Sequence, residues 1–468
     1  MKKRTMQKRI DVIVFTLLAV LFAALVVITG LLVDLFNRNT SEGNKNIPFD
    51  LDRITLNSSS VLPDDFDMLL LPEFIGIKLG EEQRGVTGSV DVIADAYRTF
   101  APAIASTLRE EYCKEGDEIR WNNISNAENY VYVRFHSQLP DMVIAMFADI
   151  TAGEIETRNK LSSYVYEMFI IPEDSTGTGE TIAVKSLSGD VFIYRNSGNE
   201  DHVSTAQLSK LLQVYSSQFK KFEFANKLSY SVTSTDPVFV ESISTRNIFM
   251  TNNVASMTYG NTVKTIMRVF GVNPDKLLNT HTGDDGTASY TDRSGVFYHY
   301  ESAFEYKATE DGGVDIDEII GYSDKNGLME YLSAALAIFD EVGRINQNYV
   351  GAEADVYLSS VTSDGSTVEL EFAYAYDNIR IAEIEPAFTA TFKDGKLMGA
   401  RVYTLAVRNV SSRSAPRAEW WFYDYLESDS REPLNVGLVY RSDFVSDKVT
   451  AEWSATVKNT PGEGYRYR

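Results

Sequence analysis

The stretch LMEYLSAALAIFDEV, residues 328–342, opens the part of the chain that decides the fold. Its apolar residues recur at steps of three and four, which indicates a helix with one buried face. Segments rich in alternating, β-branched and aromatic residues follow it at 354–360, 368–376, 388–393, 397–407, 436–440 and 451–457. Asp-Gly pairs at 364–365 and 394–395 separate consecutive segments, as in hairpin turns. One helix packed on an antiparallel meander predicts an α+β unit.

The same two signals alternate upstream of this unit. Helical spacing covers 93–108, 208–222 and 263–270, and Pro102 is expected to kink or break the first of these helices. Strand patterns occupy 130–135, 164–171 and 190–195, and a hairpin is expected over 287–300. The predicted fold class is therefore α+β, with antiparallel sheets packed against helices in several domains.

An uncharged run precedes all of these elements. From Val12 to Val33 the chain carries 22 residues without an ionisable side chain, and Lys and Arg are frequent before it. A helix of this length spans about 33 Å, close to the hydrocarbon thickness of a bilayer. Positive charge is retained on the cytoplasmic side, so the sequence predicts a single-pass anchor with residues from about 37 onward outside. A cleaved signal peptide is the alternative, but its apolar core is shorter and ends in a small-residue cleavage site.

Within this span, one face is a candidate for packing against partner helices. Ala19 and Ala23 form a small-xxx-small pair, which permits close approach of another helix, although such pairs are common in Ala-rich spans and lipid-facing filler is the favoured explanation. The candidate helix-packing residues of the anchor are Leu17, Ala19, Ala23, Val27 and Gly30.

Composition restricts the partners and the compartment. The formal net charge of −22 argues against nucleic acid as a partner. Cys113 is the only cysteine, so an intrachain disulfide is excluded, which favours a bacterial envelope protein over a large exported animal protein. A chain of this length is expected to form several domains. The expected division is a tip and transmembrane helix at 1–36, a tether at 37–59, an N-terminal part at 60–222, a middle α+β domain at 223–322, a C-terminal α+β domain at 323–460 and a tail at 461–468.

Motifs that would carry catalysis or bind metal are weak. The four histidines lack the i, i+4 spacing of a helical zinc site, and acidic turns such as 284–286 depart from the EF-hand pattern. Ser217 and Lys220 match the Ser-x-x-Lys pattern of penicillin-binding enzymes, but no Lys-Thr-Gly motif accompanies them, and we expect them on the solvent face of the 208–222 helix. We assign no catalytic residue, no metal ligand and no cofactor.

A dense aromatic cluster lies near the C-terminus. Core packing is the default interpretation of this cluster. Trp420, Trp421 and Tyr423 are also candidates for a protein interface, because Trp and Tyr are enriched among interface anchors.

Three segments, taken in order, resemble one family. They are YVYVRFHSQLP at 130–140, VFGVNPDKLLNTHTGDDGTASYTDRSGVFYHY at 269–300, and the helix and meander from 327 to about 458. Together with the basic tip and single span, they are similar to the YycH-type regulatory proteins of Gram-positive bacteria, and the last segment resembles the domain that YycH shares with its companion YycI. Residues 141–163 and the Trp420-Trp421 cluster have no place in this resemblance.

The resemblance implies a non-enzymatic role in signal transduction. Such proteins contact the two-component sensor histidine kinase of cell-wall homeostasis, WalK (also called YycG), and the companion YycI, through membrane helices and extracellular domains. Two alternatives stay open at this point: a cell-wall-associated ligand-binding module with an aromatic-lined pocket, and an enzyme of wall metabolism.

Overall fold

The computed structural model describes most of the chain after residue 68. The described residues are 69–108, 113–116, 118–152, 164–172, 180–195, 202–228, 236–251, 255, 258, 260–310, 312–320, 328–345, 354–363, 367–382, 384–416, 433–441, 448–457 and 466–467. All of them belong to the second of two compact units, Met1–Asp50 and Leu51–Arg468. The helices among these residues are too short or too polar to cross a membrane. The expected span at 12–33 lies outside them.

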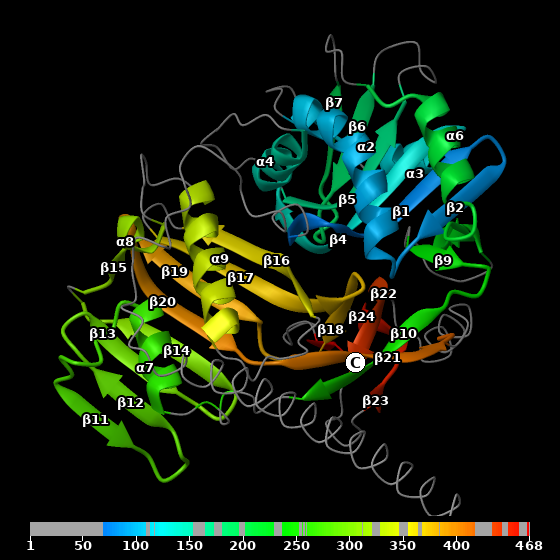
Figure 1. The fold of residues 1–468 in the computed structure, drawn as a ribbon. Helices are drawn as coiled ribbons and strands as arrows, with labels where there is room; N and C mark the ends of the chain where they lie inside the picture. The colour runs from blue at the N-terminus through cyan, green and yellow to red at the C-terminus, as the bar shows by residue number, and fades with distance from the viewer. Residues whose placement is uncertain are drawn as a thin grey trace, which may run out of the picture. The chain divides into compact units, whose positions relative to one another are not determined.

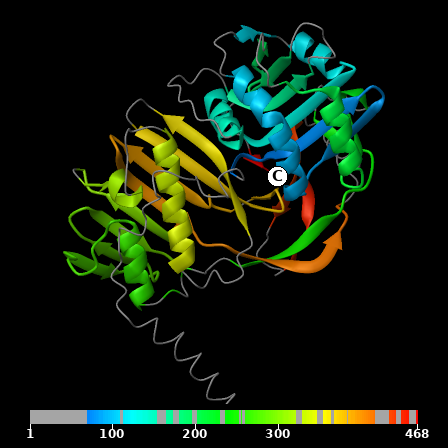
Figure 2. The same ribbon diagram turned by 45° about the horizontal axis from the view of Figure 1, so that its top comes forward.

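The described residues form a mixed fold that is mostly sheet, with seven helices (Figures 1 and 2). The helices are α2 (Val90–Leu108), α3 (Glu118–Ser125), α4 (Asp141–Ala152), α6 (Thr205–Val214), α7 (Gly260–Val269), α8 (Ile316–Ile320) and α9 (Leu328–Ile345). The α+β class expected from the sequence is confirmed at this level.

The first sheet is antiparallel and has nine strands among the described residues, in the order β3-β7-β6-β5-β4-β1-β2-β8-β9. They are β1 (Pro72–Leu79), β2 (Glu82–Val86), β3 (Cys113–Glu115), β4 (Asn129–Pro140), β5 (Tyr164–Ile171), β6 (Thr181–Lys185), β7 (Val191–Arg195), β8 (Lys220–Phe224) and β9 (Pro237–Phe239). Helices α2 and α4 pack together over this sheet (Figure 1).

Side chains on β4 alternate between two different environments. Phe135 meets Tyr97 of α2 edge-on, with ring centroids 6.4 Å apart. Tyr130 and Tyr132 join a buried aromatic cluster around Phe169, with centroids 5.1 and 5.0 Å from its ring. Buried aromatic rings on one face and contacts with a helix on the other stabilise β4 at the centre of its sheet.

A second, long sheet contains thirteen strands of the described part, ordered β11-β12-β13-β14-β20-β19-β17-β18-β22-β24-β25, with β15 paired to β20 and β16 paired to β17. They are β11 (Asn279–Thr282), β12 (Ala288–Thr291), β13 (Gly295–His299), β14 (Ala303–Ala308), β15 (Val314–Asp315), β16 (Asp355–Ser363), β17 (Thr367–Tyr376), β18 (Ile379–Ala382), β19 (Phe388–Lys393), β20 (Lys396–Tyr403), β22 (Pro433–Arg441), β24 (Ala451–Val457) and β25 (Arg466–Tyr467). Strands β18 and β22 run parallel, unlike the antiparallel arrangement expected throughout. Helix α9 packs on β17 and β19 and also contacts α7 and α8.

A small third sheet lies beside the long one, in the order β21-β10-β23. It consists of β10 (Thr245–Thr251), β21 (Ala406–Ser414) and β23 (Lys448–Val449). The expected single strand 397–407 is therefore wrong: the chain leaves the long sheet after Tyr403 and enters this small sheet at Ala406. Thr404 marks the change, since its hydroxyl donates to the Ser302 carbonyl at 3.0 Å.

Three further differences from the sequence expectations have local causes. The expected helix 208–222 ends at Val214, because Phe222 and Phe224 enter the buried aromatic cluster as alternate residues of β8. The helix α2 continues from Val90 to Leu108 with Pro102 inside it, and the side chain of Pro102 is half-buried. The expected break at this proline is therefore wrong. The helix α4 had no counterpart in the expectations, because its hydrophobic residues surround much of the helix instead of forming one stripe.

Candidate functional site

A two-residue turn between β17 and β18 joins the long sheet to the first sheet. Asp377 and Asn378 have φ values of 51° and 59°, the left-handed conformation that Asn and Asp tolerate best in tight hairpins. The Asn378 Nδ2 donates to the carbonyl of Pro72 at 2.6 Å, and its Oδ1 lies 3.1 Å from Nε2 of His136. Because a carbonyl only accepts, the amide orientation is fixed and Nε2 of His136 must carry the proton.

The same turn approaches the start of α2. Oδ1 of Asp377 accepts from the Val90 amide at 3.5 Å, where an anion is favoured by the helix dipole, and Oδ2 lies 3.5 Å from Nε of Arg246. Burial raises the pKa of Asp377 above its usual range, with Arg246 opposing this effect. Gly88 precedes the helix at φ 62°, and a Cβ there would lie 2.9 Å from Cδ1 of Ile379. The segment that leads into α2 thus requires glycine at position 88, both for its positive φ and for the close approach of Ile379.

A buried ion cluster lies behind the turn. Arg134 on β4 has only 3% of its side chain exposed, and its guanidinium lies 3.4 Å from Oε1 of Glu73 and 3.3 Å from Oδ1 of Asp236. Burial alone would lower the pKa of Arg134, but Glu73, the neighbouring tyrosines and Asp236 raise it well above the usual value. A Cβ at Gly437 of β22 would collide with Oε1 of Glu73, so the long sheet covers this cluster closely.

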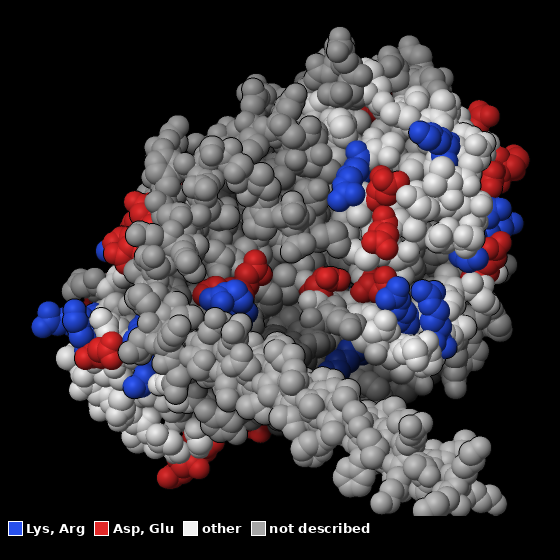
Figure 3. Space-filling view, viewed as in Figure 1, with Lys and Arg blue, Asp and Glu red and all other residues white. Residues whose placement is uncertain are grey.

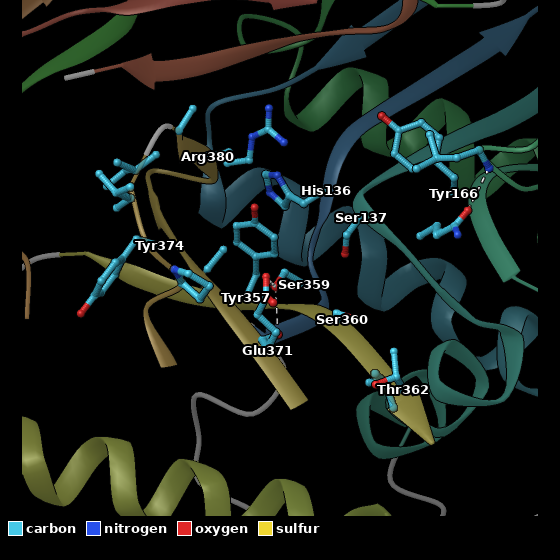
Figure 4. Close-up of a pocket in the computed structure, with 18 of the residues that line it drawn as sticks. His136, Ser137, Tyr166, Tyr357, Ser359, Ser360, Thr362, Glu371, Tyr374 and Arg380 are labelled. Atoms are coloured by element: carbon cyan, nitrogen blue, oxygen red, sulfur yellow. Dashed lines mark hydrogen bonds between the residues drawn. The ribbon is translucent and has the colours of Figure 1, made fainter. Parts of the chain in front are cut away.

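A pocket of about 780 Å³ opens beside this joint (Figure 4). Its walls come from both sheets: β4, β5 and the β6–β7 turn on one side, and β16, β17, β18 and the segment after β18 on the other. The lining residues are His136, Ser137, Gln138, Tyr164, Tyr166, Leu187, Ser188, Tyr357, Ser359, Ser360, Val361, Thr362, Glu371, Ala373, Tyr374, Arg380, Ile381, Ala382, Ile384, Glu385 and Pro386. A volume in this range and a mixture of aromatic and polar groups are typical of small-molecule sites.

His136 connects the joint to the pocket. Its ring stacks on Tyr357 with centroids 4.4 Å apart, and in Figure 4 it lies between Tyr357 and Arg380. Nδ1 of His136 is buried and has no hydrogen-bond partner among the described residues. Since Nε2 carries the proton, Nδ1 is an acceptor that lies buried beneath the pocket wall. Next to it, the Ser137 hydroxyl donates to the Leu358 carbonyl at 3.2 Å and ties β4 to β16.

The protein is expected to lose stability in acid through His136. Burial lowers the pKa of His136, and Arg380 and Arg134 lower it further, whereas Glu73 and the Asn378 hydrogen bond oppose this shift. The unfolded chain therefore binds a proton at pH values where the folded protein does not, so the stability present above about pH 6.5 falls as the pH drops below it. One such group changes the free energy of unfolding by at most about 1.4 kcal/mol per pH unit. Urea unfolding at pH 7.5, 6.5 and 5.5 should show a smaller loss for His136→Gln than for wild type; equal losses would contradict this assignment.

The other sequence candidates are not among the residues that line this pocket in the described part of the chain. The anchor residues Leu17, Ala19, Ala23, Val27 and Gly30, and the aromatic candidates Trp420, Trp421 and Tyr423, lie outside the described residues. Among the described residues there is no group of three metal-ligating side chains. His299 stacks on Phe304, and its Nε2 lies 2.7 Å from the Ala255 carbonyl.

The Ser-x-x-Lys pair does not have the expected geometry. Ser217 follows the end of α6, and its hydroxyl donates to Oε1 of Gln218, whereas Lys220 begins β8. One helical turn is needed to place the amine beside the nucleophile, and the pair lacks that turn. The pair therefore lacks the geometry that the Ser217 version of the enzyme alternative requires.

The pocket residues were not recognised from the sequence. A signal was present in the strand YVYVRFHSQLP, where Arg134 and His136 follow Tyr130 and Tyr132 at alternate positions and so share their inward face. The turn at 377–378 lacks glycine, which weakened its signature.

The chain matches no model of a known protein family and no curated protein.

Proposed function

We propose that this protein is a membrane-anchored accessory protein that regulates a sensor histidine kinase of the WalK (YycG) type in cell-wall homeostasis of a Gram-positive bacterium. In this proposal a single N-terminal helix anchors it in the cell membrane with its N-terminus in the cytoplasm, and the remaining α+β domains lie outside. It contacts the kinase, and a YycI-like companion, through the membrane helix and the outer domains, and it performs no catalysis.

The observation that carries this proposal is the uncharged run Val12–Val33 behind a basic tip and ahead of a large folded part. The three family-like segments support it: residues 130–140 lie within β4, residues 269–300 include β11 to β13, and residues 327–458 include α9 and most of the long sheet. On the face drawn in Figure 3, acidic and basic side chains of the described residues are interspersed, which suits contacts with proteins better than with a polyanion.

Regulation would work by differential binding. A partner that binds one state of a kinase better than another shifts the kinase toward that state by the difference in affinity. In the proposed mechanism, residues Leu17 to Gly30 pack against the membrane helices of the kinase, and the outer domains read its extracellular part.

The proposal predicts that the kinase is recovered with this protein from living cells. Tagged full-length protein is crosslinked in cells, purified and examined by mass spectrometry, beside a variant in which residues 12–33 are scrambled at constant composition. The scrambled run keeps its hydrophobicity and still inserts, but its packing face is changed. We expect a sensor kinase with wild type and at least a tenfold lower yield with the variant. Recovery of wall-synthesis enzymes without a kinase would refute the proposal.

A second candidate function is a ligand-binding module of the cell envelope. The pocket between the two sheets favours it, because four tyrosines, His136 and a few charged groups converge there. The two functions are compatible, since a bound ligand can be the signal that an accessory protein passes on.

A further inference from the structure

Serine hydroxyls of the pocket wall offer hydrogen-bond acceptors to a ligand. The Ser137 hydroxyl donates to the Leu358 carbonyl at 3.2 Å, and the Ser359 hydroxyl donates to the Glu371 carbonyl at 3.0 Å. Because a hydroxyl that donates its single proton keeps two acceptor lone pairs, both oxygens can accept from a ligand that carries donors.

The charges of the wall offset one another. Glu385 forms an ion pair with Nη2 of Arg401 at 2.6 Å, and Glu371 accepts a hydrogen bond from the Ser359 hydroxyl at 3.2 Å. Arg380 is the single Arg or Lys among the residues that line the pocket in the described structure. A strongly anionic ligand would meet two carboxylates and a cationic ligand would meet Arg380, so a neutral polar ligand suits this wall best.

Apolar and hydroxyl-bearing surfaces alternate around the cavity. Tyr164 lines the pocket while 44% exposed, so its ring presents an apolar surface at the open side. Deeper in, Figure 4 shows hydroxyls of Ser137, Tyr357 and Ser359 near the same space. Tyrosine rings supply rigid apolar area together with a polar group, and a few placed polar side chains then fix the orientation of a ligand.

From these groups we propose that the pocket binds a neutral saccharide of one or two rings. A sugar ring has an apolar C–H surface for Tyr164 and several hydroxyls, which donate to the carboxylate of Glu371 and accept from Arg380. This inference deepens the ligand-binding candidate above and rests on it. Because the walls come from both sheets, the sugar also favours the arrangement in which those sheets adjoin.

Binding is tested on the purified full-length chain in mild detergent. Calorimetry and saturation-transfer NMR are carried out with glucose, N-acetylglucosamine, and their β-1,4-linked disaccharides, and with the dipeptide Ala-Ala. We expect saturable binding of at least one sugar and none of the dipeptide. Tyr164→Ala and Glu371→Gln should each weaken it tenfold or more. Phe249→Ala is the matched control: Phe249 is 41% exposed on β10 and does not line the pocket, so this variant should bind as wild type does.

Three results would overturn the inference: no binding of any sugar, binding that Tyr164→Ala and Glu371→Gln leave unchanged, or binding of the dipeptide in place of a sugar. The crosslinking experiment on the wild-type protein separates failure of the saccharide inference from failure of the regulatory proposal. If wild type recovers the kinase but binds no sugar, the saccharide inference alone is wrong. If it binds sugar and recovers no kinase, the regulatory proposal alone is wrong.

Discussion

Replacing Arg134 by methionine is expected to lower the free energy of unfolding by about 3–5 kcal/mol. The side chain is 3% exposed and lies between Glu73 and Asp236, whose side chains are 9% and 0% exposed. Methionine fills much of the space but leaves two carboxylates buried without their cation. Removing one partner of a buried ion cluster is costly for this reason, even where the intact cluster adds little net stability. Urea unfolding at neutral pH measures the effect.

The matched control is Arg344→Met. Arg344 pairs with Glu341 one turn away on α9, but 70% of its side chain is exposed, so this change should cost less than about 1 kcal/mol. A variant with Arg134→Met, Glu73→Gln and Asp236→Asn should recover part of the lost stability, because it also removes the two negative charges. Equal effects of Arg134→Met and Arg344→Met would show that the buried cluster is not destabilised by loss of its cation.

Elements with a strong local pattern could be predicted from the sequence. In α2 the residues Ile93, Tyr97, Phe100, Ile104 and Leu108 were expected to form the buried face, and each is at most 4% exposed. The turn Asp394-Gly395 also forms as expected, with φ values of 50° and 78°. These features depend on spacing and on turn chemistry, which neighbouring residues alone determine.

Features that depend on distant partners could not be predicted. Residues 208–222 have helical spacing throughout, yet Phe222 pairs with Phe239 of β9 and packs on Phe74 of β1. That tertiary packing outweighs the local helical preference. The pocket is a more extreme case, because His136 and Asn378 are 242 residues apart in the chain and only the pairing of two sheets brings them together.

Asn378→Ala is expected to cost about 2–4 kcal/mol of unfolding free energy. The change removes two hydrogen bonds in a buried region and leaves the Pro72 carbonyl and Nε2 of His136 without their partner, at about 1–3 kcal/mol for each unsatisfied group before relaxation. It also places alanine at φ 59°, a left-handed conformation that Asn tolerates better than Ala and that costs an ordinary L-residue about 1–2 kcal/mol. Urea unfolding again provides the measurement.

The control for backbone strain is Asp394→Ala. Asp394 occupies the equivalent kind of hairpin turn at φ 50° but is exposed and belongs to the β19–β20 turn. Alanine there should cost only the strain, about 1 kcal/mol, so the excess cost of Asn378→Ala measures the joint between the two sheets. If that excess comes from the bond to His136, the effects of Asn378→Ala and His136→Ala will not add in the double variant, because either change alone already breaks the bond. Strict additivity would instead mean that the hydrogen bond between Asn378 and His136 contributes little, and that the surrounding packing holds the two sheets together.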